Sequence, residues 1–230
     1  MLYLIFFGLL QAIASPEVRE MTPVPADSHV QSDAPTAAEA ASLDLPMSDW
    51  EYLQDQGWEH RVGEGPGVWI SVEEQMLRIV QGTRILWEVP CATAAKGTGS
   101  LGGSMKTPLG WHKIGTKVGD GAPWGQVFRS RVATREIWKP GQASKEDLVL
   151  TRVMVLDGLE PGQNQGRNAE GKLVDSRERC IYIHGTNQEE LIGTPSSHGC
   201  IRLRNDDVIS AYEKMSENLP VLITERATSE

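Results

Sequence analysis

The sequence contains no run rich in lysine or arginine, although nucleic-acid-binding proteins usually carry a basic patch or stripe. Its 22 basic residues are outnumbered by 31 acidic residues, which gives a formal net charge of −9 at pH 7. An acidic surface favours solubility but does not specify a fold. The composition therefore indicates no nucleic-acid partner.

A membrane-spanning segment is also missing at the N-terminus, where residues 2–10 are apolar but too few to cross a bilayer as a helix. Ala12-Ile13-Ala14 follows as a small-x-small cleavage site, so residues 1–14 are typical of a secretory signal peptide. No lysine or arginine precedes the apolar stretch, and a buried N-terminal segment is the alternative. We expect an exported protein of the periplasm or cell envelope, with no integral membrane span after signal removal. No cysteine near the cleavage site supports a lipid anchor.

Cysteine is scarce, with only Cys91, Cys180 and Cys200 in 230 residues. An odd count in an exported protein suggests one pair and one free thiol, and Cys200 is the expected free one. Whether Cys91 and Cys180 pair stays open, because a disulfide needs their Cα atoms within about 7 Å. Two buried thiols are the alternative. The sequence also lacks a CxxC pair, which argues against a closed zinc site with four ligands.

Large apolar residues are almost absent from residues 15–46, so we expect residues 15–64 to form a flexible leader with a short docking segment. A helix or turn over residues 49–58 would dock Trp50 and Trp58. Residues 65–226 form the expected folded domain. It is mostly β, because the chain has 23 glycines and 13 prolines that favour turns over long helices.

Short apolar segments predict the elements of this domain. The expected strands cover residues 68–72, 76–80, 85–90, 111–114, 127–138, 148–156, 180–184, 200–203 and 221–223. One late helix is indicated by Val208, Ile209, Tyr212 and Met215 at helical spacing, with Asn205 or Asp206 as its cap. The polar segment 160–179 is long enough to be functional or mobile, and we expect it to act as a lid.

Two of these strands present polar residues on one face. Side chains alternate along a strand, so Tyr182 and His184 share a face, as do Cys200 and Arg202. The apolar residues between them can then enter the core. The same partition in both strands points to a site built from these four residues.

The residue types on this face suit nucleophilic catalysis. A thiol attacks a carbonyl as thiolate, and His184 can take the proton of Cys200 and later return it to a leaving amine. Backbone N–H groups of Gly199 and Cys200 can stabilise an oxyanion. The carbonyl of Gly185 can orient the imidazole of His184, in place of the carboxylate of other triads.

These residues resemble a known signature. His184-Gly185 followed by Ser197-His198-Gly199-Cys200 is similar to the motif of the L,D-transpeptidase (YkuD) domain. Thr107-Pro108-Leu109-Gly110 resembles the Thr-Pro-x-Gly turn of such domains. Some members carry asparagine two residues after the cysteine, where this chain has Arg202.

The resemblance implies a β-sandwich-like catalytic domain with no metal or cofactor. Its donor and acceptor would be peptidoglycan stem peptides, cleaved between diaminopimelate and the terminal D-Ala through a Cys200 acyl-enzyme. An amine acceptor would give a 3-3 cross-link or attach a protein to the wall. Water as acceptor would make the enzyme a carboxypeptidase or endopeptidase.

The remaining positions of the motif have open roles. His198 can line the acyl site, donate near the oxyanion or hold its loop. Ser197 can contact substrate or hydrogen-bond locally, and Tyr182 can contact substrate or pack. Arg202 can bind a substrate carboxylate in a bidentate manner or pair with an acid.

Two other classes of function stay open. His184, His198 and Cys200 could serve as three zinc ligands. The chain could also be a non-catalytic wall-binding module, although such modules commonly lose the nucleophile or the base, and both are present here.

Overall fold

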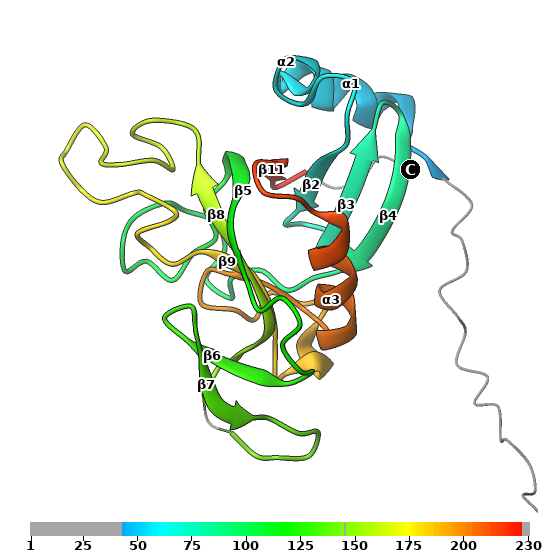
Figure 1. Cartoon of the computed structure of the whole chain (residues 1–230). Helices are drawn as coiled ribbons and strands as arrows, with labels where there is room; N and C mark the ends of the chain where they lie inside the picture. Colours follow the sequence, from blue (N-terminus) through cyan, green and yellow to red (C-terminus); the bar gives the residue numbers. More distant parts are fainter. Residues whose placement is uncertain (1–42, 145, 227–230) are drawn as a thin grey trace, which may run out of the picture. The chain divides into compact units, whose positions relative to one another are not determined.

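The computed structural model describes residues 43–144 and 146–226, so the predicted signal peptide and residues 15–42 of the leader lie outside the described residues. The described chain is mostly β structure in one connected sheet of 11 strands (Figure 1). The strands are β1 (Leu43–Asp44), β2 (Gly67–Ser71), β3 (Met76–Gln81), β4 (Arg84–Pro90), β5 (Gly110–Val118), β6 (Gln126–Arg129), β7 (Val132–Ile137), β8 (Val149–Gly158), β9 (Tyr182–Gly185), β10 (Ile201–Leu203) and β11 (Pro220–Thr224). The helices are α1 (Met47–Asp55), α2 (Trp58–Val62), the 3-10 turn η1 (Glu189–Leu191) and α3 (Asn205–Lys214). The predicted fold class, mostly β with one late helix, is confirmed.

The last strand joins the two halves of the sheet. The strand order is β1-β4-β3-β2-β11-β5-β8-β6-β7, with β9 added to β8 and β10 added to β9. Strand β11 pairs in parallel with β2 and antiparallel with β5. The predicted closing strand therefore exists, and it lies in the interior of the sheet.

The main core lies between the two halves of the sheet and α3. Helix α3 packs against β8 and β9 (Figure 1). Apolar side chains from both halves meet in a single cluster, which includes Val68, Ile70, Leu77, Ile114, Met154, Leu156, Ile183, Ile201 and Val208. Because both halves contribute to one core, the sheet is sandwich-like.

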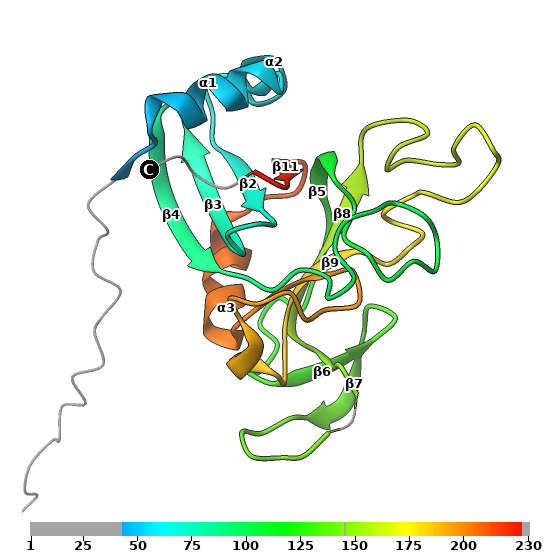
Figure 2. The same ribbon diagram turned by 180° about the vertical axis from the view of Figure 1, so that it is seen from behind.

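A second cluster lies under the N-terminal helices. Leu53 and Trp58 pack with Trp69, Trp111 and Leu222 on the face of the sheet that α1 and α2 cover (Figures 1 and 2). Trp58 is fully buried in this cluster, and Trp50 is partly buried against it. The indole rings of Trp58 and Trp111 lie 5.7 Å apart between centroids, which favours this docking beyond simple area burial.

The expected single strand over residues 127–138 is wrong. The chain reverses at Ser130 and Arg131, which have φ angles of 49° and 67°, and forms the hairpin of β6 and β7. Neither residue is a glycine or an asparagine, so the turn has no strong local signal.

The predicted cap of the late helix is also wrong. Arg204 occupies the N-cap position and makes no side-chain cap hydrogen bond. The amide of Asn205 instead donates to the carbonyl oxygen of Thr186 at 2.8 Å and to Glu189 at 2.6 Å. The side chain of Asn205, which could have capped the helix, is therefore used in tertiary hydrogen bonds.

The segment between β8 and β9 is tied to the sheet by buried polar contacts. Asn164 Nδ2 donates to the carbonyl oxygens of Leu109 and Trp111, each at 3.0 Å. Ser176 lies 2.9 Å from His112 Nε2. Whether residues 160–179 act as a lid stays a prediction.

Within the described ranges, no helix has the length and apolar character that crossing a membrane requires.

Candidate active site

The pairing of β9 with β10 creates the polar face of the site. The strands are parallel, with Ile201 opposite Ile183 and Arg202 opposite His184. Ile181, Ile183, Ile201 and Leu203 all enter the main core. Tyr182 and Cys200 pack instead with Phe128, Val153 and Val155 on the other side. The predicted division of the two strands into an apolar and a polar face is confirmed.

His184 is held by its neighbour. Its Nδ1 donates to the carbonyl oxygen of Gly185 at 2.8 Å, and the side chain is buried. Because Nδ1 carries the proton, Nε2 is the basic nitrogen of the neutral ring. Burial lowers the pKa of His184 below its ordinary value, so the resting imidazole is neutral.

A glycine is required after the histidine because the backbone is crowded there. A Cβ at Gly185 would lie 2.5 Å from Asn205 Oδ1 and 2.9 Å from the carbonyl oxygen of Leu150. Both distances are shorter than normal contacts. The absence of a side chain therefore allows β9 to end against α3 with its carbonyl facing His184.

The nucleophile candidate rests as a thiol. Cys200 is partly exposed, and its Sγ donates to the carbonyl oxygen of Cys180 at 3.3 Å. No hydrogen bond joins Cys200 to His184 within the described residues. Burial raises the pKa of Cys200 to about 12, so both partners are neutral before substrate arrives.

The loop before Cys200 is fixed by hydrogen bonds from the Ser197 hydroxyl. Ser197 Oγ donates to the carbonyl oxygen of Cys200 at 2.6 Å and accepts from the N–H of Gly199 at 3.1 Å. Ser197 is buried, and its hydroxyl makes the local hydrogen bonds that were one of its two expected roles. Its contact with substrate stays a prediction. Since the Gly199 N–H is used internally, the Cys200 N–H is the remaining predicted donor for an oxyanion.

Gly199 connects this loop to the Thr-Pro-x-Gly turn. Thr107 Oγ1 donates to the carbonyl oxygen of Gly199 at 3.0 Å and accepts from the N–H of Ala94 at 3.0 Å. Gly199 has a φ of 130°, and a Cβ there would lie 3.2 Å from the carbonyl oxygen of Lys106. The two motifs, far apart in sequence, are therefore parts of one site.

Arg202 lies under the site with its side chain 0% exposed. Its NH1 donates to Asp147 Oδ1 at 2.9 Å and to Gln188 Oε1 at 2.7 Å, and its NH2 donates to Ser196 Oγ. The pairing with an acid is thus present, and binding of a substrate carboxylate stays a prediction.

Sequence reasoning missed Asp147. This aspartate accepts from Arg202 through one oxygen and from His198 Nδ1 through the other, the latter at 3.1 Å. It lies in a polar segment just before β8, and nothing in its local sequence distinguishes it from neighbouring acids such as Glu146. Only the tertiary structure brings it to the motif.

Tyr182 is buried on the polar face. Its hydroxyl has no hydrogen-bond partner among the described residues. Burial raises the pKa of Tyr182 above its ordinary value. A buried hydroxyl without a partner is unusual, which fits a contact that forms only with substrate, and that contact stays a prediction.

All three cysteines are free in the structure. Cys91 is buried in the core, where burial raises its pKa to about 12, whereas Cys180 is exposed. The alternative that both thiols are buried is therefore wrong for Cys180.

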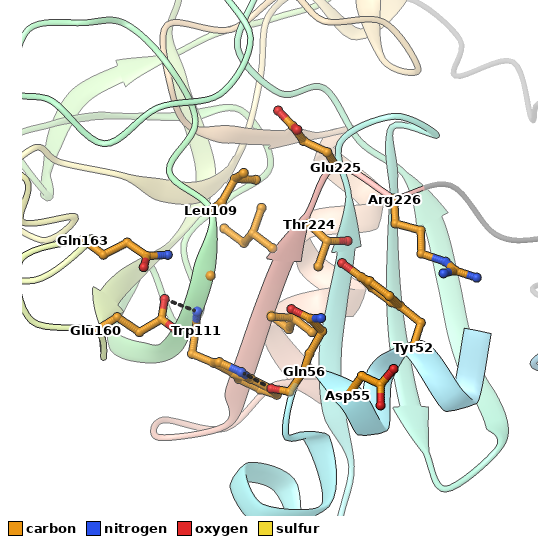
Figure 3. A pocket seen from close by; sticks show the side chains of 13 residues that line it. Tyr52, Asp55, Gln56, Leu109, Trp111, Glu160, Gln163, Thr224, Glu225 and Arg226 are labelled. Atoms are coloured by element: carbon orange, nitrogen blue, oxygen red, sulfur yellow. Dashed lines mark hydrogen bonds between the residues drawn. The ribbon is translucent and has the colours of Figure 1, made fainter. Parts of the chain in front are cut away.

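A separate cavity of about 450 Å³ contains none of the predicted site residues (Figure 3). It lies beside the second cluster, between α1, β5 and β11. Glu160 accepts from the N–H of Trp111 at 3.1 Å, and the Trp111 indole donates to the carbonyl oxygen of Gln56 at 2.8 Å (Figure 3). These two contacts form part of its walls.

The described residues include no group of three His, Cys, Asp or Glu that could hold a metal ion.

Comparison with curated proteins gives one relative of moderate identity. YqjB of Bacillus subtilis (strain 168), which is named as an L,D-transpeptidase on a provisional basis, is 46% identical over 71 residues. That match covers 30% of this chain and 40% of YqjB. The chain thus spans less than half of this relative.

Solved structures give weaker matches. An L,D-transpeptidase from Mycobacterium smegmatis aligns with a TM-score of 0.42 at 14% identity, over 70% of this chain and 59% of that one. Bd1075 of Bdellovibrio bacteriovorus aligns with a TM-score of 0.42 at 17% identity, over 70% and 48%.

The family model for the L,D-transpeptidase catalytic domain (YkuD) matches residues 65–223, which is more than half of the chain. This stretch contains the His184-Gly185 pair, the loop that leads to Cys200 and the Thr107 turn. The chain belongs to the L,D-transpeptidase (YkuD) catalytic domain family.

Proposed function

We propose that the chain is a cysteine L,D-transpeptidase that acts on peptidoglycan stem tetrapeptides through an acyl-enzyme on Cys200. The single observation that carries this proposal is the arrangement of the paired strands β9 and β10. His184, with Nδ1 committed to Gly185, and Cys200 lie on one polar face, which leaves Nε2 of His184 as the base for the thiol.

Acylation begins from the neutral pair. Nε2 of His184 takes the proton of Cys200 as the thiolate attacks the carbonyl carbon of the diaminopimelate–D-Ala bond. The N–H of Cys200 faces the developing oxyanion. His184 then returns the proton to the amine of D-Ala, which leaves, and a thioester remains.

Neutral resting partners suit this sequence of steps. Burial opposes the charged forms of both Cys200 and His184, so an ion pair forms only when substrate supplies compensating contacts. The thiol is thereby less exposed to unproductive reactions, because the reactive thiolate appears only in the substrate complex.

The second half-reaction decides the product. An amine acceptor on a second stem peptide gives a 3-3 cross-link, and an amine on a protein attaches that protein to the wall. Water would instead give L,D-carboxypeptidase or endopeptidase activity. We further propose that the protein is exported and works in the periplasm or cell envelope, where this substrate lies.

The test is mass spectrometry of products from purified protein and a disaccharide tetrapeptide. Wild type is expected to release D-Ala and form 3-3 dimers, whereas Cys200→Ala does neither. Cys180→Ala is the matched control, because it removes the neighbouring exposed thiol but keeps the carbonyl that Cys200 contacts. Tripeptide without dimers would favour hydrolysis, and binding without any change of substrate would favour a wall-binding module.

A further inference from the structure

The backbone around Asp147 is fixed on both sides by one side chain. The amide of Asn187 accepts from the N–H of Leu148 at 2.9 Å and donates to the carbonyl oxygen of Glu146 at 3.1 Å. Asn187 lies three residues after His184, on the loop that leaves β9. The position of Asp147 is therefore set by the loop that directly follows the strand of His184.

Both carboxylate oxygens of Asp147 are used. Oδ1 accepts from the buried Arg202 at 2.9 Å, and Oδ2 accepts from Nδ1 of His198 at 3.1 Å. The side chain of Asp147 is 17% exposed, so its pairing with Arg202 is shielded from solvent. This shielded pair orients the carboxylate for a second partner.

That second partner faces solvent. The side chain of His198 is 68% exposed, although Ser197 and Gly199 on either side are held by internal hydrogen bonds. Because Nδ1 of His198 donates to Asp147, Nε2 carries the lone pair of the neutral ring. The structure thus holds a basic nitrogen on the exposed side of the loop, two residues before Cys200.

We propose that Asp147 is a positioning residue that acts through His198 on the acceptor amine, an inference that rests on the proposed function. An alkyl amine arrives at neutral pH as an ammonium ion and must lose a proton before it can attack a thioester. Nε2 of His198 takes this proton, and the carboxylate of Asp147 stabilises the imidazolium formed. The exposed ring then releases the proton to solvent.

The protons balance over the two histidines. The neutral amine attacks the thioester carbon, its second proton passes to Nε2 of His184, the C–N bond forms and the C–S bond breaks. The Cys200 thiolate takes the proton from His184 and regenerates the resting thiol. His184 alone cannot serve both steps, because it is buried and its one free nitrogen is needed for the proton that moves to sulfur.

The test separates two kinds of acceptor. Transfer of the acyl group is measured with an alkyl amine, which is charged at pH 7, and with hydroxylamine, which is largely neutral. Asp147→Asn and His198→Ala are expected to slow transfer to the alkyl amine by about 10²-fold, in the range of general-base catalysis. Transfer to hydroxylamine should fall by at least about tenfold less than transfer to the alkyl amine, because this acceptor has no proton to lose before it attacks. Glu146→Gln is the matched control, since the side chain of this neighbouring acid pairs with Arg129 at the surface and its backbone contact with Asn187 is kept.

The double variant gives the decisive comparison. If Asp147 acts through His198, then Asp147→Asn adds no further loss in a His198→Ala background. Equal losses with both acceptors, or additive losses in the double variant, would overturn the proposal and assign Asp147 a structural role through Arg202. Should Asp147→Asn fail to fold, Asn187→Ala takes its place, because it releases the backbone on both sides of Asp147 and should give the same selective loss with the alkyl amine. Wild type that releases no D-Ala would instead refute the proposed function and this inference with it.

Discussion

Thr107 donates a hydrogen bond of 3.0 Å to the carbonyl oxygen of Gly199 across 92 positions of sequence. The same hydroxyl accepts from the N–H of Ala94, and the side chain is fully buried. The contact holds the backbone directly before Cys200, the proposed nucleophile, so the Thr-Pro-x-Gly turn fixes the position of the loop that carries it.

Replacing Thr107 by valine keeps the shape but leaves two buried backbone groups without partners. We expect a loss of about 1–3 kcal/mol in the free energy of unfolding, together with slower release of D-Ala. Urea unfolding and the acylation rate measure the two effects. Thr107→Ser keeps the hydroxyl and should recover most of the acylation rate, and equal rates for serine and valine would contradict this account.

Gly185→Ala is expected to damage both stability and activity. The new Cβ would approach Asn205 Oδ1 and the carbonyl oxygen of Leu150 at 2.5 and 2.9 Å, so β9 must shift and the support of His184 shifts with it. A loss of about 1–3 kcal/mol is expected from this overpacking.

Thermal unfolding and D-Ala release test the Gly185 prediction. Gly65→Ala is the matched control, because the nearest atom to its Cβ would be the carbonyl oxygen of Val62 at 3.9 Å. Similar stability of the two variants would show that the end of β9 adapts to a side chain.

Acid should weaken the fold through His112. Burial lowers its pKa from 6.5 to about 4, while Nδ1 donates to Gly110 and Nε2 accepts from Ser176. The unfolded chain therefore binds the proton first, and stability is lost as the pH falls from about 6.5 to about 4. The full shift corresponds to roughly 3 kcal/mol.

Chemical unfolding of wild type and His112→Gln at a series of pH values tests this dependence. The variant should be less stable at pH 7 but should lose less stability on acidification. Parallel curves for the two proteins would mean that other groups, such as the buried His184, carry the pH dependence.

The two thiols next to the site should differ in reactivity. Cys180 is exposed, whereas burial raises the pKa of Cys200 to about 12, so thiolate is rare there without substrate. With limiting iodoacetamide at pH 7, peptide mass spectrometry should find Cys180 modified first. Faster modification of Cys200 would show that His184 activates the thiol already in the free enzyme.

Local sequence predicted most strands of the domain and the division of the two site strands into faces, but it missed the hairpin of β6 and β7. Alternation along two strands separates Ile183 and Ile201 from Tyr182 and Cys200, because strand geometry forces neighbouring side chains to opposite faces. The late helix followed from spacing in the same way. The cap of this helix did not follow from the sequence, because the side chain of Asn205 donates instead to the carbonyl oxygen of Thr186 in the loop after β9.

The rest was decided by contacts between distant segments. The sequence by itself determined which face of its own strand carries His184 and which carries Cys200, since that depends only on the period of a strand. The pairing of β9 with β10 then brought the two faces together. Tertiary structure alone decided that Thr107 supports Gly199 and that Asp147 joins Arg202 to His198. A hydrogen bond between residues more than fifty positions apart depends on how strands are ordered in the sheet, and no local pattern of residues encodes that order.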